Sequence, residues 1–171
     1  MPLFTHHAAL PPSIRARLEL ARGDQIIASA EINAGWAVAT RLALYTTTSD
    51  GGIKRRPWSD VDHASLEPET ATITVAWVDG RIQALQLLEN DNKRPAFARA
   101  LRERVQSSIV HAETVPLPGG GHVRVALRRD EAGALFSQVT AKGRVDLNDP
   151  AVAALVDDAE ARVRGAAGLP R

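Results

Sequence analysis

Hydrophobic and polar residues alternate in the first half of the chain with the two-residue period of β-strands. Turn-forming residues divide this half into five strand segments. The segments cover residues 25–32, 36–48, 53–64, 70–78 and 81–88. Asp79-Gly80, between the last two, is a strong hairpin signal, and Pro57 marks an edge or a bulge. The pattern predicts a meander of five antiparallel strands.

Helical spacing replaces the strand period at three places. Residues 13–20 fit a short helix or an extended entry segment, of which we favour the helix. Pro95 suits a first helical position, and the apolar residues Phe97, Leu101, Val105 and Ile109 then recur every fourth residue. Near the C-terminus, Asp149-Pro150 is a typical helix start, and the apolar spacing continues to Val163. The sequence therefore predicts two amphipathic helices after the meander.

Three regions follow from these elements. Residues 1–12 end in two prolines, which favours a flexible tail. Residues 13–112 hold the meander and the first long helix, which would plug the open end of a small barrel. Residues 113–171 hold a hairpin, with strands near 123–127 and 135–140, and the last helix. We expect this extension to pack on the barrel, and the predicted fold class is α+β, mainly β.

Short motifs within residues 24–110, about half of the chain, match a known pattern. They are Thr40-Arg41-Leu42-Ala43-Leu44, Arg56-Pro57-Trp58-Ser59-Asp60-Val61-Asp62 and the helix that contains Phe97. This region resembles bacterial pleckstrin-homology-like (PH-like) domains, in which a T-x-R-L-x-L strand and an I-P-W-x-x-I/V strand precede a capping helix. The resemblance implies a binding fold with seven or more barrel strands, so one long segment would have to be two strands. The chain also resembles small proteins of high-GC bacteria, from which no activity carries over.

Composition narrows the chemistry and the location. The chain has 171 residues and no Cys, which excludes thiol nucleophiles, disulfides and thiolate metal sites. Its 21 basic and 20 acidic residues give a net charge of +1, so bulk charge indicates neither a nucleic-acid nor a membrane binder. The chain has no apolar run of about 18 residues and begins without a secretion signal. We therefore expect a cytoplasmic protein.

Motifs for catalysis or metal binding are missing from the sequence. Neither a Gly-x-Ser-x-Gly elbow nor a His-Glu-x-x-His helix occurs. His6-His7 lie in the predicted tail, and a strand over Asp60-Val61-Asp62-His63 would place the carboxylates and the imidazole on opposite faces. Gly119-Gly120-Gly121-His122 lacks the Lys-Ser/Thr and the helix of a phosphate-binding loop. We expect no cofactor and no metal, and binding is favoured over catalysis.

Basic residues supply the candidate contact sites. Lys54, Arg55 and Arg56, beside Trp58, suit an anionic head group or phosphate, with Arg41 as a further contact, or else form a solvated hairpin tip. Seven acids and one arginine give residues 59–91 a net charge of −6, whereas seven arginines and two glutamates give residues 94–129 a net charge of +5. These two segments either pair with each other or expose a basic face that meets an acidic protein. The candidate residues on that face are Arg99, Arg102 and Arg128.

These observations favour a non-catalytic cytoplasmic interaction module. Its expected partner is another protein or a second copy of the chain, reached through a strand edge or the Trp58 region. One alternative is a peripheral binder of an anionic lipid head group or phosphate, and another is a small enzyme of unknown reaction. With three Phe, three Trp and one Tyr, few aromatic rings are free to stack on bases, so nucleic acid is disfavoured.

Overall fold

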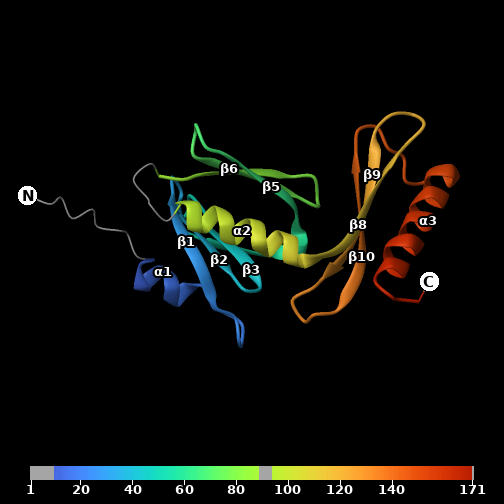
Figure 1. Cartoon of the computed structure of the whole chain (residues 1–171). Coiled ribbons are helices and arrows are strands. Elements are labelled where there is room, and N and C mark those ends of the chain that lie inside the picture. Colours follow the sequence, from blue (N-terminus) through green and yellow to red (C-terminus); the bar gives the residue numbers. More distant parts are fainter. Residues whose placement is uncertain (1–9, 89–93, 171) are drawn as a thin grey trace, which may run out of the picture. The chain divides into compact units, whose positions relative to one another are not determined.

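The computed structural model describes residues 10–88 and 94–170, which form ten strands, three helices and one 3-10 turn (Figure 1). All strand pairs are antiparallel, and the strands form three sheets. The predicted α+β class, with more residues in strands than in helices, is confirmed. Most of the predicted tail, including His6-His7, lies outside the described residues.

The first sheet has four strands in sequence order and follows a short helix. The elements are α1 (Pro12–Arg17), β1 (Ile26–Ile32), β2 (Gly35–Thr40), β3 (Ala43–Thr47) and β4 (Ile53–Pro57). The segment predicted as one strand over 36–48 is two strands, because the Thr40 hydroxyl accepts the backbone N–H of Ala43 at 3.0 Å and closes a turn. The helix at the start of the domain is confirmed.

The second sheet has three strands, again in sequence order. After the 3-10 turn η1 (Trp58–Asp60) come β5 (Val61–Glu67), β6 (Thr72–Trp77) and β7 (Ile82–Gln86). The predicted strand over 53–64 is thus divided at the turn, since Pro57 lacks an N–H and interrupts the ladder. Seven strands, not five, precede the long helix.

The two sheets meet along β1 and β7. The N–H of Asn33 donates to the carbonyl of Gln86 at 3.1 Å, the N–H of Leu88 donates to the carbonyl of Glu31 at 3.1 Å, and Ile32 forms a bridge with Leu87. Among the described strands, β4 and β5 do not pair with each other and stay the outer strands. The described strands therefore do not form a closed barrel.

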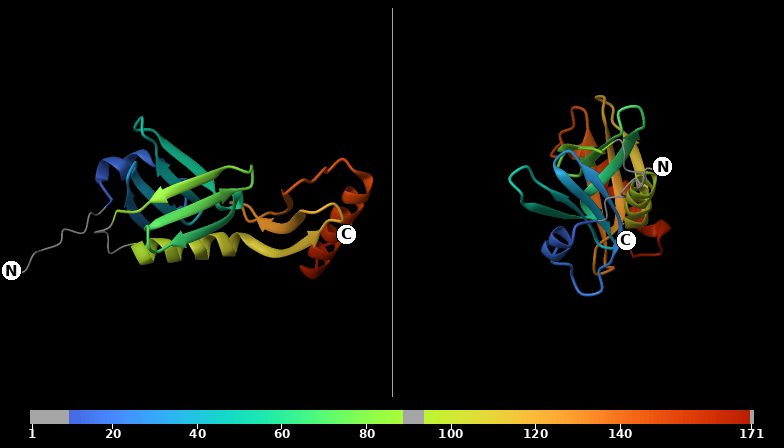
Figure 2. Two further views of the ribbon diagram at one scale, coloured as in Figure 1. Left: turned by 90° about the horizontal axis from the view of Figure 1, so that it is seen from above. Right: turned by 90° about the vertical axis from the view of Figure 1, so that its left-hand side faces the viewer.

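The helix α2 (Arg94–Ser108) follows β7 and runs alongside these strands (Figures 1 and 2). Its predicted apolar stripe is confirmed over three positions, since Phe97, Leu101 and Val105 are buried. The fourth position, Ile109, is the first residue of a strand. The helix therefore ends one residue before the last position that its apolar spacing predicts.

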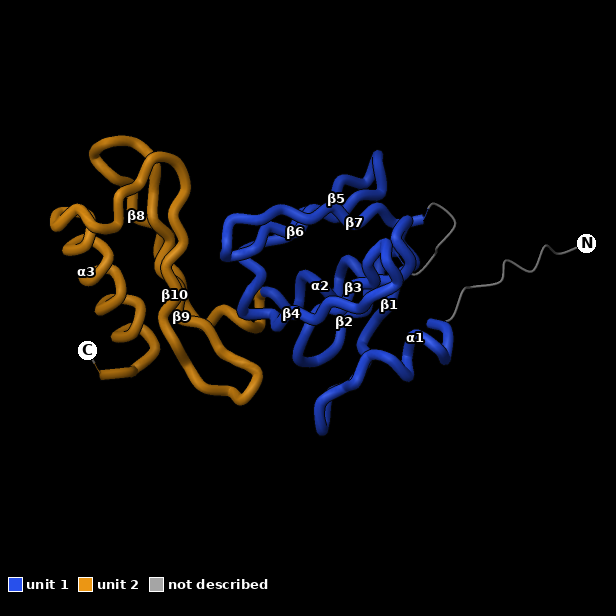
Figure 3. The backbone as a smooth tube through the Cα atoms, turned by 180° about the vertical axis from the view of Figure 1, so that it is seen from behind, with its two compact units in different colours: residues 1–105 blue, residues 106–171 orange. Residues whose placement is uncertain are grey.

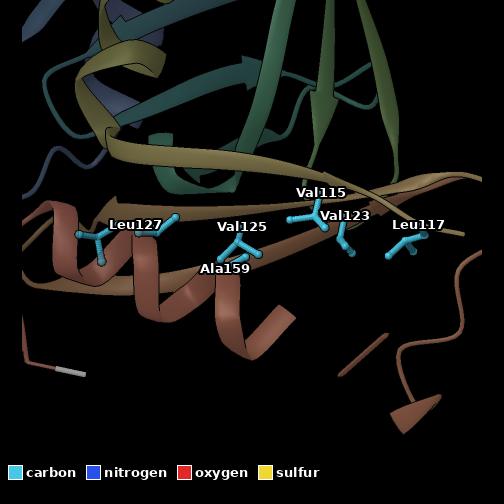
Figure 4. Close-up of a cluster of buried hydrophobic side chains, with 7 residues drawn as sticks. Val115, Leu117, Val123, Val125, Leu127 and Ala159 are labelled. Atoms are coloured by element: carbon cyan, nitrogen blue, oxygen red, sulfur yellow. The ribbon is translucent and has the colours of Figure 1, made fainter. Parts of the chain in front are cut away.

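The C-terminal part contains a three-stranded sheet in the order β10-β9-β8 and a helix. Its elements are β8 (Ile109–Pro116), β9 (His122–Arg129), β10 (Leu135–Lys142) and α3 (Pro150–Ala166). The predicted hairpin and last helix are confirmed, but β8 was missed because the helical spacing continued into it. One face of this sheet packs on α3 (Figure 4). The buried cluster consists of Val115, Leu117, Val123, Val125, Leu127, Ala159 and Val163.

The chain divides into two compact units, residues 1–105 and 106–171 (Figure 3). We call them unit 1 and unit 2. The boundary lies inside α2, whereas the sequence analysis placed it after residue 112. The expected packing of the extension on the first region stays a prediction.

Unit 2 contains a surface ion pair that predicts a pH dependence. The Nη2 of Arg162 on α3 lies 2.6 Å from Oε1 of Glu113 on β8, and the guanidinium lowers the pKa of Glu113 below its ordinary value of 4.5. A carboxylate with a lowered folded pKa stabilises the fold above its unfolded pKa and loses this contribution as the pH falls through the folded pKa. We expect Glu113→Gln to lower the stability of unit 2 slightly at pH 7 and by less at pH 3. Urea denaturation followed by circular dichroism measures this, and an equal difference at both pH values would contradict it.

Candidate functional site

The predicted basic run lies on β4 but does not converge on one point. Lys54 is exposed, and the Nε of Arg55 donates to the hydroxyl of Tyr45 at 3.0 Å. Arg56 is only 13% exposed and lies with its guanidinium 4.2 Å from the centre of the Trp77 ring. These contacts hold Arg55 and Arg56 on the protein itself.

Two carboxylates neutralise Arg56. Its Nε lies 3.3 Å from Oδ2 of Asp60, and its Nη2 lies 3.1 Å from Oδ2 of Asp79. The backbone N–H of Arg81 and then the Arg56 side chain lower the pKa of Asp79 from its ordinary value. Asp60 and Asp79 thus neutralise Arg56, which the sequence predicts as a contact for an anionic ligand. This arrangement favours the solvated hairpin over an anion site.

Trp58 is a core residue and not a contact surface. Its side chain is 4% exposed, and its Nε1 donates to the backbone carbonyl of Thr40 at 3.0 Å. Burial removes the Trp58 side chain itself as a partner contact, and a partner site elsewhere in this region stays a prediction. An indole that buries its ring and has one satisfied N–H donor is a typical packing anchor.

Thr40 also joins a buried polar network that the sequence analysis missed. Its hydroxyl donates to Oδ2 of Asp24 at 2.9 Å, and Oδ1 of Asp24 accepts the backbone N–H of Leu42 at 3.1 Å. Asp24 is buried. Two of the segments that carry the PH-like resemblance, around Thr40 and Trp58, thus meet in space for a structural reason.

The predicted basic face loses one of its three members. Arg128 lies on β9 and is fully buried, so it adds no charge to the surface. Arg99 and Arg102 lie on α2, and both are exposed. The two exposed arginines belong to unit 1, and they border a hollow that the sequence analysis did not find.

This hollow is a groove of about 410 Å³ between α2 and the outer strand of the second sheet. We call it the β5–α2 groove. Its volume falls within the range of about 300–1,000 Å³ that is common for ligand pockets. The lining residues are Ala64, Ser65, Leu66, Ile73, Pro95, Ala98, Arg99, Leu101 and Arg102.

Strand register explains why the groove is apolar. Ala64 pairs with Val75 and Leu66 pairs with Ile73, and residues that face each other across an antiparallel pair point to the same side of the sheet. Val75 and Ile73 are buried, so Ala64 and Leu66 point to the inner side as well. The small side chain of Ala64 leaves space beside α2, and Leu66 is 42% exposed at the rim. An apolar surface is thus left uncovered along β5.

The charged lining of the groove has one sign. Arg99 and Arg102, one turn apart on α2, are its two charged lining residues. The Arg99 side chain is 80% exposed, and its Nε lies 2.9 Å from Oε1 of Glu103. An exposed i,i+4 ion pair of this kind contributes little to stability, so another carboxylate can replace it. The sequence predicts these arginines as contact residues but does not predict the apolar floor beside them.

A second hollow of about 280 Å³ lies in unit 2, between the loop that joins β8 to β9 and the start of α3. Its polar groups serve the local backbone. Asp149 accepts the N–H of Ala151 and caps α3, and Asp146 accepts the N–H of Asn148 at 2.9 Å. These contacts account for both carboxylates as parts of the helix start.

Within residues 10–88 and 94–170, no group of three or more His, Asp or Glu side chains is placed to hold a metal ion. His63 has its Nδ1 2.8 Å from Oδ2 of Asp62, which is a pair and not a cluster.

None of the described helices is long and apolar enough to cross a membrane. Comparisons with protein-family models, curated proteins and solved structures find no match for this chain.

Proposed function

We propose that the chain is a non-catalytic cytoplasmic protein-interaction module and that its docking site is the β5–α2 groove. The observation that carries this proposal is the combination of an outer strand, an uncovered apolar floor and exposed arginines at one place. Contiguous apolar surface with a polar rim is typical of protein-binding sites.

A PH-like assignment of unit 1 belongs to the same proposal. Four antiparallel strands, then three, and then a helix agree with what the resemblance implies. The hydrogen bond between Trp58 and Thr40 links two of its motifs. The open seam between β4 and β5 distinguishes this chain from a closed barrel, and it leaves the β5 edge available to a partner.

The two outer strands at the seam differ in a way that favours β5 as the docking edge. β4 carries the exposed charges of Lys54 and Arg55, and such charges protect a strand edge from pairing with other chains. The middle of β5, Ala64-Ser65-Leu66, has no charge. The groove thus lies beside the less protected edge.

The alternatives receive less support from the contacts. An anionic lipid or phosphate would have to displace two carboxylates from Arg56. A small enzyme usually places titratable groups of unlike pKa in one pocket, whereas the titratable side chains that line the groove are two arginines. Protein binding therefore fits this site better than either.

A pair of matched variants tests the proposal. Leu66→Asp puts a charge into the groove, and Ile82→Asp puts the same charge on β7, where Ile82 is 73% exposed. Proteins captured from a lysate of the source organism are purified, and their affinity for the full chain and both variants is measured by calorimetry. We expect Leu66→Asp to weaken a one-to-one complex at least about tenfold, which corresponds to about 1.4 kcal/mol, and Ile82→Asp to leave it unchanged. Equal affinities for both variants would place the docking site elsewhere.

A further inference from the structure

We infer that the partner supplies an extended acidic segment that adds as a strand beside β5. Apolar side chains of this segment would enter the β5–α2 groove, and its carboxylates would bind Arg99 and Arg102. This inference rests on the proposed function, since it names the chemistry of the occupant of that groove.

The outer backbone edge of β5 suits an extended segment. β5 pairs with β6 through residues 61–67 and is the outer strand of its sheet. In an antiparallel ladder, alternate residues turn their N–H and C=O groups toward one neighbour, and the residues between them turn theirs to the other side. Along the middle of β5, over residues 64–66, the outward groups can therefore pair with an incoming extended chain. A helix satisfies its own backbone groups and would gain nothing from this edge.

The alternation of side chains along a strand determines which residues of the partner segment would enter the groove. Every second residue of a strand beside β5 points to the inner side, level with Ala64 and Leu66. There it meets the apolar floor that Ile73 and Leu101 complete, and the residues between point to solvent. The expected ligand sequence therefore alternates, with apolar residues at every second position.

The charges of Arg99 and Arg102 determine which sign of charge the partner segment needs. The arginines lie one turn apart on the helix wall and are exposed, so carboxylates at inner positions of the segment that flank the apolar ones can reach both. The Arg99 side chain is 80% exposed, so its guanidinium is accessible to an acid that replaces Glu103. A basic segment would face two like charges without a carboxylate among the lining residues. The groove thus selects acidic segments.

A displayed library of random twelve-residue peptides, presented to the immobilised full chain, tests the inference. We expect enriched peptides to alternate apolar and polar residues and to contain Asp or Glu. Arg99→Glu combined with Arg102→Glu should reduce the affinity of a selected peptide about tenfold or more. The matched control, Arg15→Glu combined with Arg22→Glu, reverses two exposed charges near α1 and should have no effect.

N-methylation along a selected peptide tests the strand directly, because each methyl group removes one backbone N–H donor. We expect affinity to fall about tenfold at every second position and to stay within about twofold at the positions between. Peptides that bind the groove with a helical spacing or a basic composition would overturn the strand inference and leave the docking site intact. If no selected peptide is sensitive to Leu66→Asp, both the inference and the proposed docking site fail.

Discussion

Trp58→Ala is expected to destabilise unit 1 by about 3–5 kcal/mol, as is usual when a buried large aromatic side chain is removed. The indole is buried, and its loss also leaves the carbonyl of Thr40 without the Nε1–H donor that lies 3.0 Å away. The loss is large against the total stability of about 5–15 kcal/mol that is usual for a domain. All three Trp residues precede residue 105, so Trp fluorescence during guanidinium unfolding reports unit 1.

Trp58→Phe is the matched control for this variant. It keeps an aromatic ring in the core and removes the hydrogen-bond donor, so we expect a smaller loss of about 1–2 kcal/mol. If Trp58→Ala leaves the unfolding midpoint unchanged, Trp58 is not the core anchor described above. Its side chain would then be open again as a contact surface.

Phe97→Ala is expected to cost about 3–5 kcal/mol of the stability of unit 1 and to weaken the groove. Phe97 is fully buried on α2, and this helix forms one wall of the β5–α2 groove. Ala has a higher helix propensity than Phe, so the loss reflects packing and not the tendency of the segment to form a helix. Guanidinium unfolding measures the stability, and binding of a selected peptide measures the groove.

An exposed apolar residue provides the control for Phe97. Ile82→Ala removes a side chain that is 73% exposed and should change the free energy of unfolding by no more than about 0.5 kcal/mol. Similar losses for Phe97→Ala and Ile82→Ala would mean that α2 is not held by its apolar stripe. The helix wall of the groove would then be unstable in solution.

Local signals in the sequence were sufficient where one short segment decides the structure. Asp79-Gly80 forms the predicted turn, with φ at Gly80 of +83° and the N–H of Trp77 bonded to the carbonyl of Arg81 at 2.9 Å. Asp149 caps α3 as its position before Pro150 predicts. The backbone groups that need a partner in these cases lie within four residues of the side chain or turn that satisfies them.

The predicted strand boundaries were wrong where a side chain interrupts a ladder. Thr40 and Pro57 each divide a segment that looked continuous, because a hydroxyl can close a turn and a proline cannot donate to a sheet. The strand β8 was missed because Ile109 also fits the spacing of the preceding helix. A periodic pattern does not show where a helix ends and a strand begins when one apolar residue, here Ile109, fits both spacings.

The candidate site shows what sequence and tertiary structure each determined. The sequence by itself determined the succession of a meander, a long helix, a hairpin and a last helix, the α+β class, and Arg99 and Arg102 as candidate contacts, but not the number of strands. Only the tertiary structure decided that Arg56 is held by Asp79, that Arg128 is buried, and that Leu66 lies beside α2. Periodicity and turn residues act within a few positions of the chain. Which residues line a groove depends on strand register and on contacts between residues far apart in sequence, such as Leu66 and Leu101.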